Sequence, residues 1–317
     1  MIWRSFSNYQ FIRIKNPEVS RFLEEKLTQI DSLTLRRKLK IKHNLTLNTI
    51  NSQITGKTAL TIPVLNDILL EINSLNGEMI KWILSTSRVT SGVGGVSPSV
   101  KIPTELDSDL AYLIGALRDG NLSVRSDKGD YVVEIYQKNT AWLKEIILPI
   151  CERLFDINLK LKMYNRAFGN YGRVRIWSKP ILVFIRDVFE HPFTRNKAWN
   201  TPKVILQANT EIQKAYISGF FDTEGWLAKN FRSLAVVQSW HENDKCPPLD
   251  DIKMILQSMG IKSSVRNRSG KTNPNWKPRY LLSITNKNGI RNFILNIGSR
   301  HPDKAENLEN FLRLCKP

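Results

Sequence analysis

Two acidic residues, Asp119 and Glu224, each end a short apolar stretch and are each followed by a glycine. The stretches, LAYLIGALRDG at 110–120 and KAYISGFFDTEG at 214–225, both have the composition of a helix. A carboxylate at a helix C-terminus is disfavoured by the helix dipole by about 0.3–1 kcal/mol, and two carboxylates in one confined site repel each other. A divalent metal with oxygen ligands would offset both effects. We therefore expect Asp119 and Glu224 to bind divalent metal.

The two stretches are copies of one another. Five residues of the first recur in the second, namely Ala111, Tyr112, Gly115, Asp119 and Gly120 as Ala215, Tyr216, Gly219, Glu224 and Gly225. The first stretch is one residue shorter between its inner glycine and its acid. Glycine inside a helix costs roughly 1 kcal/mol relative to alanine, so Gly115 and Gly219 predict a close approach of two helix backbones. Gly120 and Gly225 are expected to end the helices in the left-handed conformation.

The segments that follow the two stretches predict the same order of elements twice, because their apolar residues alternate in strands and recur at helical spacing in helices. The first copy reads as strands at 121–125 and 131–137, a helix at 140–155, strands at 159–164 and 173–177, and a helix at 180–189. The second copy reads as strands at 226–228 and 233–238, a helix at 249–259, strands at 261–268 and 280–284, and a helix at 289–297. These elements predict two copies of one α+β unit.

Within this pattern, the segment ISGFFDTEG at 217–225 fits residue for residue the motif of the LAGLIDADG homing endonucleases. The chain resembles the single-chain, two-repeat form of that family over residues 105–315. The resemblance implies two pseudo-symmetric αββαββα repeats, at 103–208 and 209–317, whose helices pack on antiparallel, saddle-shaped sheets. It also implies a monomeric, site-specific endonuclease that hydrolyses both strands of double-stranded DNA with Mg²⁺ or another divalent cation such as Mn²⁺. Asp119 and Glu224 would be the metal ligands and would serve opposite strands.

Further polar residues pair between the repeats: Gln137 with Gln238 near the end of a strand, and Lys179 with Lys287 after the last strand. In the family, such positions hold side chains that position water and stabilise charge near the scissile phosphates. The resemblance therefore makes these four residues catalytic candidates. The alternative is that they only cap strand ends. Arg118, next to the first acid, is a cation that could take over part of the role of the metal.

One face of the later strands is basic in both repeats. The residues expected on it are Lys160, Lys162, Arg173, Arg175 and Trp177 in the first repeat and Arg266, Arg268, Lys271, Lys277 and Arg279 in the second. Strands can read base edges in the DNA major groove, where Arg and Lys bind guanine. The alternative is a Lys-rich face that only improves solubility, and such a face would usually carry acidic residues as well. These residues are therefore our candidates for DNA contacts.

The composition limits the kinds of partner. The chain has 317 residues, 41% of them hydrophobic, and a formal net charge of +18. Such a charge indicates nucleic acid rather than an anionic membrane, because no apolar run approaches the roughly 18 residues of a membrane span. The N-terminus also lacks the apolar core of a signal peptide, so we expect a protein inside the cell with its DNA, in the cytoplasm, the nucleoid or an organelle. The cysteines Cys151, Cys246 and Cys315 are too widely spaced for a zinc site.

Residues 1–84 read as a separate, small all-α domain, and residues 85–102, rich in Ser, Gly and Val, read as a linker. Short helical runs around the Gly56-Lys57 turn resemble the recognition helix and the following helix of a phage-repressor helix-turn-helix domain. In that interpretation, a basic run would contact DNA phosphates: Arg36, Arg37, Lys38, Lys40 and Lys42. In the alternative, the domain is a helical bundle that supports the repeats, and the basic run is a solvated face.

A second functional class stays open at this point. The chain could have kept the fold and lost cleavage, as a transcription regulator or as a maturase that binds structured intron RNA. The two retained acids favour cleavage, whereas the shortened first stretch and the N-terminal segment favour binding. A self-splicing intein is not expected, because residues 314–317, LCKP, lack the terminal His-Asn pair that splicing needs.

Overall fold

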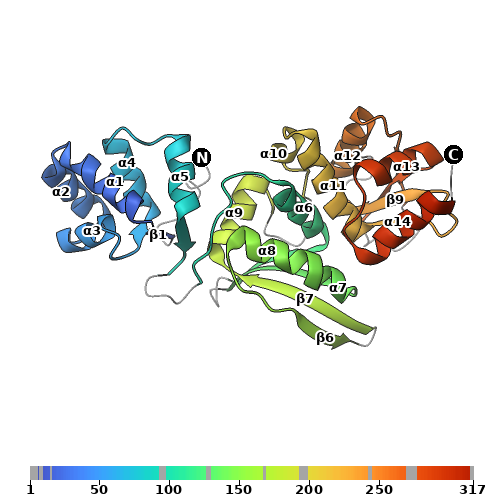
Figure 1. Ribbon diagram of the computed structural model, residues 1–317, viewed down its shortest axis with the longest axis horizontal. Helices are drawn as coiled ribbons and strands as arrows, with labels where there is room; N and C mark the ends of the chain where they lie inside the picture. The colour runs from blue at the N-terminus through green and yellow to red at the C-terminus, as the bar shows by residue number, and fades with distance from the viewer. Residues whose placement is uncertain are drawn as a thin grey trace.

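A computed structural model describes residues 6, 10–14, 16–92, 98–125, 130–166, 169–192, 199–241, 245–268 and 277–314. These residues form three bodies that follow one another along the longest axis of the molecule (Figure 1). The N-terminal unit, which we define as the described residues up to 92, lies at one end. The first repeat lies in the middle and the second repeat at the other end. Two residues singled out in the sequence, Lys271 and Cys315, lie outside the described ranges.

The N-terminal unit packs its helices against a small antiparallel sheet. The helices are α1 (Pro17–Thr28), α2 (Ser32–His43), α3 (Leu47–Ile54), α4 (Ile62–Glu71) and α5 (Gly77–Thr86). Strand β1 (Phe11–Ile14) lies between β2 (Leu60–Thr61) and β3 (Ser87–Thr90). The prediction of an all-α domain is therefore wrong, because short strands whose partners are far apart in the sequence leave no local signal.

The expected linker at 85–102 is also wrong in part. Strand β3 lies inside it, and Val89 and Val100 exchange backbone hydrogen bonds of 2.8 Å. Arg88 donates to the backbone oxygens of Ser99 and Asp156, which ties β3 to the end of a helix in the first repeat. The described part of this stretch is therefore a packed junction between the N-terminal unit and the first repeat.

The two repeats have the same succession of elements and the same strand order. The first contains α6 (Ser108–Ala116), a 3-10 turn (Leu117–Asp119), β4 (Asn121–Arg125), β5 (Asp130–Gln137), α7 (Thr140–Trp142), a π-helical turn (Leu143–Ile147), α8 (Leu148–Phe155), β6 (Lys162–Arg166), β7 (Gly169–Trp177) and α9 (Lys179–Phe189). After α10 (Lys203–Leu206), the second contains α11 (Thr210–Glu224), β8 (Gly225–Leu227), β9 (Leu234–Ser239), α12 (Pro247–Ser258), β10 (Ser264–Asn267), β11 (Arg279–Ile284), α13 (Lys287–Asn296) and α14 (Pro302–Leu314).

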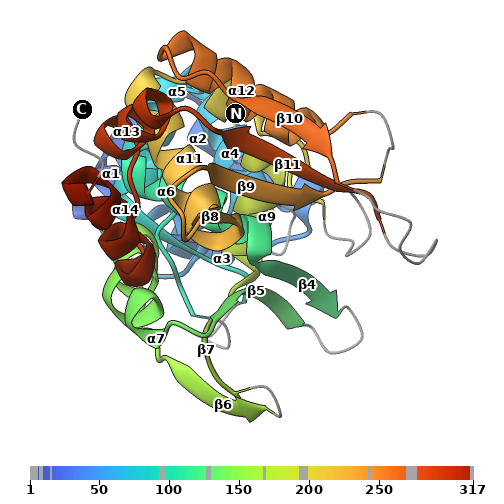
Figure 2. The ribbon, with the colours of Figure 1, turned by 90° about the vertical axis from the view of Figure 1, so that its right-hand side faces the viewer.

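Both sheets are antiparallel, with the orders β4-β5-β7-β6 and β8-β9-β11-β10. Seen from the second repeat, α7, α13 and α14 lie on one side of the molecule, and the strands of both sheets reach out on the other (Figure 2). The predicted α+β fold with two copies of one unit is confirmed. Helices α10 and α14 were not predicted.

The two motif helices, α6 and α11, pack against each other at the centre of the molecule, and glycine makes their close approach possible. A Cβ atom on Gly115 would lie 2.1 Å from the backbone oxygen of Tyr216, and one on Gly219 would lie 2.1 Å from that of Tyr112. No side chain fits at such a distance. The prediction that these glycines mark a helix crossing is confirmed, and the crossing is symmetric.

The missing residue of the first motif is compensated by a change of helix type. Leu117–Asp119 forms a 3-10 turn, whereas α11 stays α-helical up to Glu224. A 3-10 helix rises about 2.0 Å per residue and an α-helix about 1.5 Å, so three 3-10 residues cover the axial length of four α-helical ones. Asp119 and Glu224 therefore reach corresponding ends of their helices despite the unequal spacing.

The glycines that follow the acids are not left-handed caps, and that prediction is wrong. Gly120 has φ −84° and Gly225 has φ −104°, both in the extended region, because the chain passes directly from the helix into a strand. Glycine is required there for space. A Cβ atom would lie 2.8 Å from Cδ2 of Leu117 at Gly120, and 2.2 Å from Cδ2 of Phe221 at Gly225.

Candidate active site between the two repeats

The two motif acids stand at the ends of the crossing helices. Asp119 is the last residue of the 3-10 turn after α6, and Glu224 is the last residue of α11. Burial raises the pKa of both carboxyl groups. The negative charge of Asp119 adds to this effect on Glu224, whose pKa rises to about 7. Helix α11 also contacts the 3-10 turn that ends at Asp119, which agrees with the prediction that the two carboxylates lie close together.

A third acid, Asp222, lies within α11 and is fully buried. It accepts hydrogen bonds from the hydroxyl of Tyr112 at 2.6 Å and from the backbone N–H groups of Arg300 and His301 at 2.8 and 3.1 Å. The hydroxyl of Ser299 also donates to it. Asp222 therefore fixes the loop that leads into α14 against the motif helices. Sequence reasoning missed this residue, although an acid inside an apolar helical run was the available signal.

Helix α14 carries Lys304 to the end of α11. The Nζ atom of Lys304 donates to the backbone oxygens of Phe221 at 2.9 Å and Gly225 at 2.6 Å. These oxygens lie at the negative end of the helix dipole, where a cation is stabilising. Burial lowers the pKa of Lys304 to about 8, while the three nearby carboxylates oppose that shift. Lys304 is thus a cation placed by the protein beside the second motif acid.

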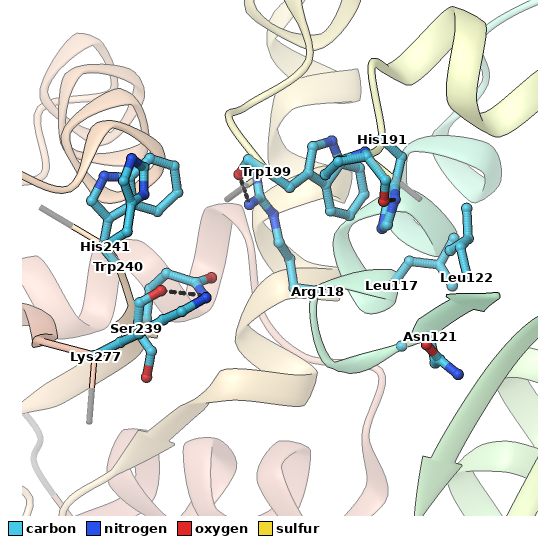
Figure 3. Close-up of a pocket in the computed structure, with 13 residues that line it drawn as sticks. Leu117, Arg118, Asn121, Leu122, His191, Trp199, Ser239, Trp240, His241 and Lys277 are labelled. Carbon is cyan, nitrogen blue, oxygen red and sulfur yellow. Dashed lines mark hydrogen bonds between the residues drawn. The ribbon is translucent and has the colours of Figure 1, made fainter. Parts of the chain in front are cut away.

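Arg118 is held between the repeats by contacts of its own (Figure 3). Its Nε and Nη2 atoms donate to the hydroxyl of Tyr216 at 3.0 and 2.6 Å. The guanidinium also donates to the backbone oxygens of Trp199 and Asn200 and lies 4.5 Å from the centre of the Trp199 ring. Through these contacts Arg118 links the two repeats, and whether its charge also takes over part of the role of the metal stays a prediction.

Comparisons with known proteins agree with this geometry. A family model described as a LAGLIDADG-like domain matches residues 211–298. Homing endonuclease I-ApeI from Aeropyrum pernix is 32% identical over 206 residues, which cover 64% of this chain and 86% of that protein. The chain belongs to the LAGLIDADG homing endonucleases.

Two further similarities are more distant. Homing endonuclease I-DmoI from Desulfurococcus mucosus is 24% identical to this LAGLIDADG chain over 199 residues, which cover 60% of this chain and 88% of that one. A crystal structure of I-DmoI in complex with DNA and Ca is similar with a TM-score of 0.47 and 21% identity, covering 65% of this chain and 98% of that chain.

The two glutamine candidates occupy equivalent places in the LAGLIDADG repeats. Two residues after each motif acid, Asn121 faces Glu134 and Trp226 faces Ala235 across the strand pair. Gln137 and Gln238 each come three residues after that facing residue. Gln238 lines a cavity of about 290 Å³ next to Gly120, and its Oε1 atom is buried with no hydrogen-bond partner among the described residues. Gln137 accepts a hydrogen bond from the backbone N–H of Lys138 at 2.8 Å. Of the two glutamines, Gln238 is therefore the one whose side-chain oxygen can accept a further hydrogen bond, and it lies beside the first motif.

The two lysine candidates lie away from the acids. Lys179 and Lys287 are the first residues of α9 and α13. The strand register places Gly120 level with Val174 and Gly225 level with Leu282. Each lysine comes five residues after that level, a separation of roughly 16 Å at about 3.3 Å per residue. The Nζ atom of Lys179 lies 5.1 Å from the centre of the Tyr131 ring. The role predicted for these lysines, at the scissile phosphates, therefore stays a prediction, and the lysine that lies beside the motif acids is Lys304.

The candidate DNA-contact residues fall on the outward faces of the LAGLIDADG sheets. In β7, Arg173, Arg175 and Trp177 alternate with the buried residues Val174 and Ile176, as predicted. Arg173 and Arg175 are half-buried and Trp177 is exposed. The other described candidates are exposed: Lys162 faces Arg173 in the β6–β7 pair, Lys160 precedes β6, Arg266 lies in β10, Arg268 follows it, Arg279 begins β11 and Lys277 precedes it.

The outward face of the first sheet is organised around a buried carboxylate that sequence reasoning missed. Glu134 accepts hydrogen bonds from Asn121 at 3.0 Å, Tyr136 at 2.5 Å and Nε of Arg175 at 2.6 Å. These donors and the charge of Arg175 hold the pKa of Glu134 below its ordinary value, against the effect of burial. In the second sheet the equivalent position is Ala235, so the two faces differ.

The described residues contain neither a membrane-spanning helix nor a larger cluster of metal-binding side chains. No described helix is long and apolar enough to cross a membrane. Within the same residues, no group of three or more His, Cys, Asp or Glu side chains could hold a metal ion.

Proposed function

We propose that this chain is a homing endonuclease that hydrolyses both strands of double-stranded DNA at a specific site, with divalent cations held by Asp119 and Glu224. The observation that carries the proposal is the meeting of two acids, from two copies of one motif, at the ends of crossing helices. The names of the relatives I-ApeI and I-DmoI, both homing endonucleases, support it.

The two carboxylates fit a hard divalent cation. Mg²⁺ is often bound by only one or two protein carboxylates and keeps water and phosphate oxygens as its other ligands. Burial and the negative charge of Asp119 together raise the pKa of Glu224, so a bound cation would stabilise the ionised carboxylates. We infer Mg²⁺, with Mn²⁺ as a substitute. When bound, such a cation would activate water and neutralise the charge that develops on the scissile phosphate.

The chain itself would hold the duplex and the attacking water around these acids. The exposed cations of both sheets would bind phosphates and base edges, with Arg175 already oriented by Glu134. The unpartnered Oε1 of Gln238 would accept a hydrogen bond from a water molecule, and Gln137 would be its counterpart in the other repeat. Because one chain supplies both repeats, at 103–208 and 209–317, a monomer would suffice to cut both strands.

Cleavage of a randomised duplex DNA library in the presence of Mg²⁺ tests this function. We expect double-strand cuts enriched at one site and lost on chelation of the metal. Tight, site-selective binding without cuts, under conditions in which I-DmoI cuts its own site, would contradict the proposal. That result would instead favour a binding protein, such as a transcription regulator or an intron RNA maturase.

Removal of the ammonium group of Lys304 should slow the cleavage of one DNA strand more than the cleavage of the other. In Lys304→Met, the backbone oxygens of Phe221 and Gly225 lose a donor, at a cost of about 1–3 kcal/mol, and Glu224 loses a cation that stabilises its ionised form. We expect cleavage of the strand served by Glu224 to fall about 10-fold or more, so that nicked DNA accumulates. Duplexes labelled on either strand measure the two rates separately.

Two variants control this experiment. Lys304→Arg keeps the charge and should restore part of the lost rate. Arg313→Met removes a positive charge from an exposed position of the same helix and should leave both rates unchanged. An equal loss on both strands in Lys304→Met would mean that Lys304 supports the fold in general rather than the second acid.

A further inference from the structure

Helices α2 and α3 of the N-terminal unit form a compact pair with a short connection. Only residues 44–46 separate the end of α2 from the start of α3. Asn44 makes the sharp change of direction in the left-handed conformation, with φ 51°. Thr46 caps α3 by accepting a hydrogen bond from the backbone N–H of Thr49 at 3.0 Å. A turn of three residues between two packed helices is the geometry of a helix-turn-helix motif.

The inner faces of this pair are packed, which fixes the direction of the outer faces. Leu35 and Leu39 of α2 and Ile50 and Ile54 of α3 are all buried in the core of the N-terminal unit. Helices α1 and α4 supply the other side of that core. The polar side of α3 is therefore directed outward by a rigid support, as a helix that reads DNA requires.

The outward residues of α3 and its C-terminal turn can form hydrogen bonds but carry no negative charge. Asn48, Thr55 and Lys57 are exposed, and Asn51 and Ser52 are half-buried. Asn, Ser and Lys side chains are among those that bind base edges in the major groove. Over residues 32–66, between Asp31 and Asp67, the sequence contains six Lys and Arg and no Asp or Glu, so this segment carries a net positive charge.

Helix α2 offers cations beside this surface. Lys38 and Lys42 form ion pairs with Glu71 and Asp67 of α4, at 3.0 and 2.8 Å. Arg37 and Lys40 are exposed on the same helix. In a helix-turn-helix motif, the first helix crosses the phosphate backbone while the second enters the groove.

The N-terminal unit is fixed to the first repeat next to a basic groove. Arg88 of β3 pairs with Asp156, at the end of α8. Beside this pair lies a groove of about 540 Å³ whose lining includes Lys160, Lys162 and Arg175. Arg175 belongs to the outward face of the first sheet, so the groove connects that face with the N-terminal unit. Figure 1 shows the N-terminal unit beyond the first repeat along the long axis of the molecule.

We propose that α3 reads the major groove of the same DNA duplex that the repeats cut, on the side of the first repeat, with α2 on the phosphates. This inference rests on the proposed function and extends it. The target would be asymmetric, with a flank recognised by the N-terminal unit next to one half-site only.

The test compares footprints on a duplex selected by the full-length chain from a random library, with the metal chelated to prevent cutting. For the unchanged protein we expect protection to extend about 5–10 base pairs further on one side of the core site, up to one helical turn. Asn48→Ala/Lys57→Ala should lose this extension and bind about 10-fold more weakly. Arg21→Ala, which removes an exposed charge from α1, should keep both.

Substitution of the flanking DNA provides a second measurement. It should weaken binding of the unchanged protein about 10-fold and leave the binding of Asn48→Ala/Lys57→Ala unaffected, because the same contact is lost in both cases. A protected and cleavable core site without any flanking protection would overturn this inference and leave the proposed function intact. The absence of a protected core site would instead overturn the proposed function, and this inference with it.

Discussion

Glu224→Gln should leave a protein that cuts only one strand of its target. The amide keeps the shape of the side chain but removes the charge that holds a cation, so we expect the rate on one strand to fall about 10³-fold. Asp119→Asn should have the same effect on the opposite strand, because the two acids occupy corresponding helix ends. The double variant should cut neither. A supercoiled plasmid that carries the site distinguishes nicked from linear product.

This prediction has a control for folding and a control for charge. Because the two carboxylates repel each other, loss of one of them should not lower the melting temperature of the metal-free protein at pH 8, above the raised pKa of Glu224. Glu211→Gln removes an acid from the exposed first turn of the same helix and should cut normally. Linear product from Glu224→Gln at the normal rate would exclude Glu224 as a metal ligand.

Gly219→Ala, like Gly115→Ala on the other side of the crossing, should cause a large loss of stability for the addition of a single methyl group. The new Cβ atom would lie 2.1 Å from the backbone oxygen of Tyr112, and backbone atoms of α6 cannot turn aside as a flexible side chain can. The motif helices would have to separate, which would disturb the Asp222 network and the approach of the two acids. We expect a loss of about 3 kcal/mol or more in the free energy of unfolding, together with weaker cleavage of both strands.

Urea unfolding measures this effect, and another glycine provides the matched control. Gly77, in the first turn of α5, has no atom within 4 Å of an added Cβ, so Gly77→Ala should be neutral or slightly stabilising. If Gly219→Ala and Gly77→Ala unfolded at the same urea concentration, the close helix crossing would not exist in solution.

The local pattern predicted much of the fold and the two motif acids. Alternation and helical spacing are properties of consecutive residues, so most strands and helices of the repeats were found close to their observed bounds. Gly115 and Gly219 predicted the helix crossing because an unfavourable residue inside a helix needs a tertiary reason. The 3-10 turn that ends at Asp119 was not predicted. The choice between an α-helical and a 3-10 turn depends on the position that the last residue takes in the folded protein, and the local sequence does not contain that information.

The missed features depend on contacts between distant parts of the chain. Lys304 meets the oxygens of Phe221 and Gly225 about 80 positions away in the sequence, and nothing in its own segment indicates this. Glu134 and Asp222 are buried acids whose partners come from other elements. Sequence reasoning chose Lys179 and Lys287 because they recur in both repeats, and recurrence alone cannot say how far a side chain lies from the motif acids.

The Glu134 cluster gives the two halves of the binding surface different adaptability. Arginine side chains that are already held in place lose little conformational entropy on binding, but they also tolerate few alternative base sequences. The second sheet has Ala235 in place of the central acid, so no carboxylate at that position orients its basic side chains. Retargeting of this protein to new DNA sequences would therefore start most productively at the half-site of the second repeat.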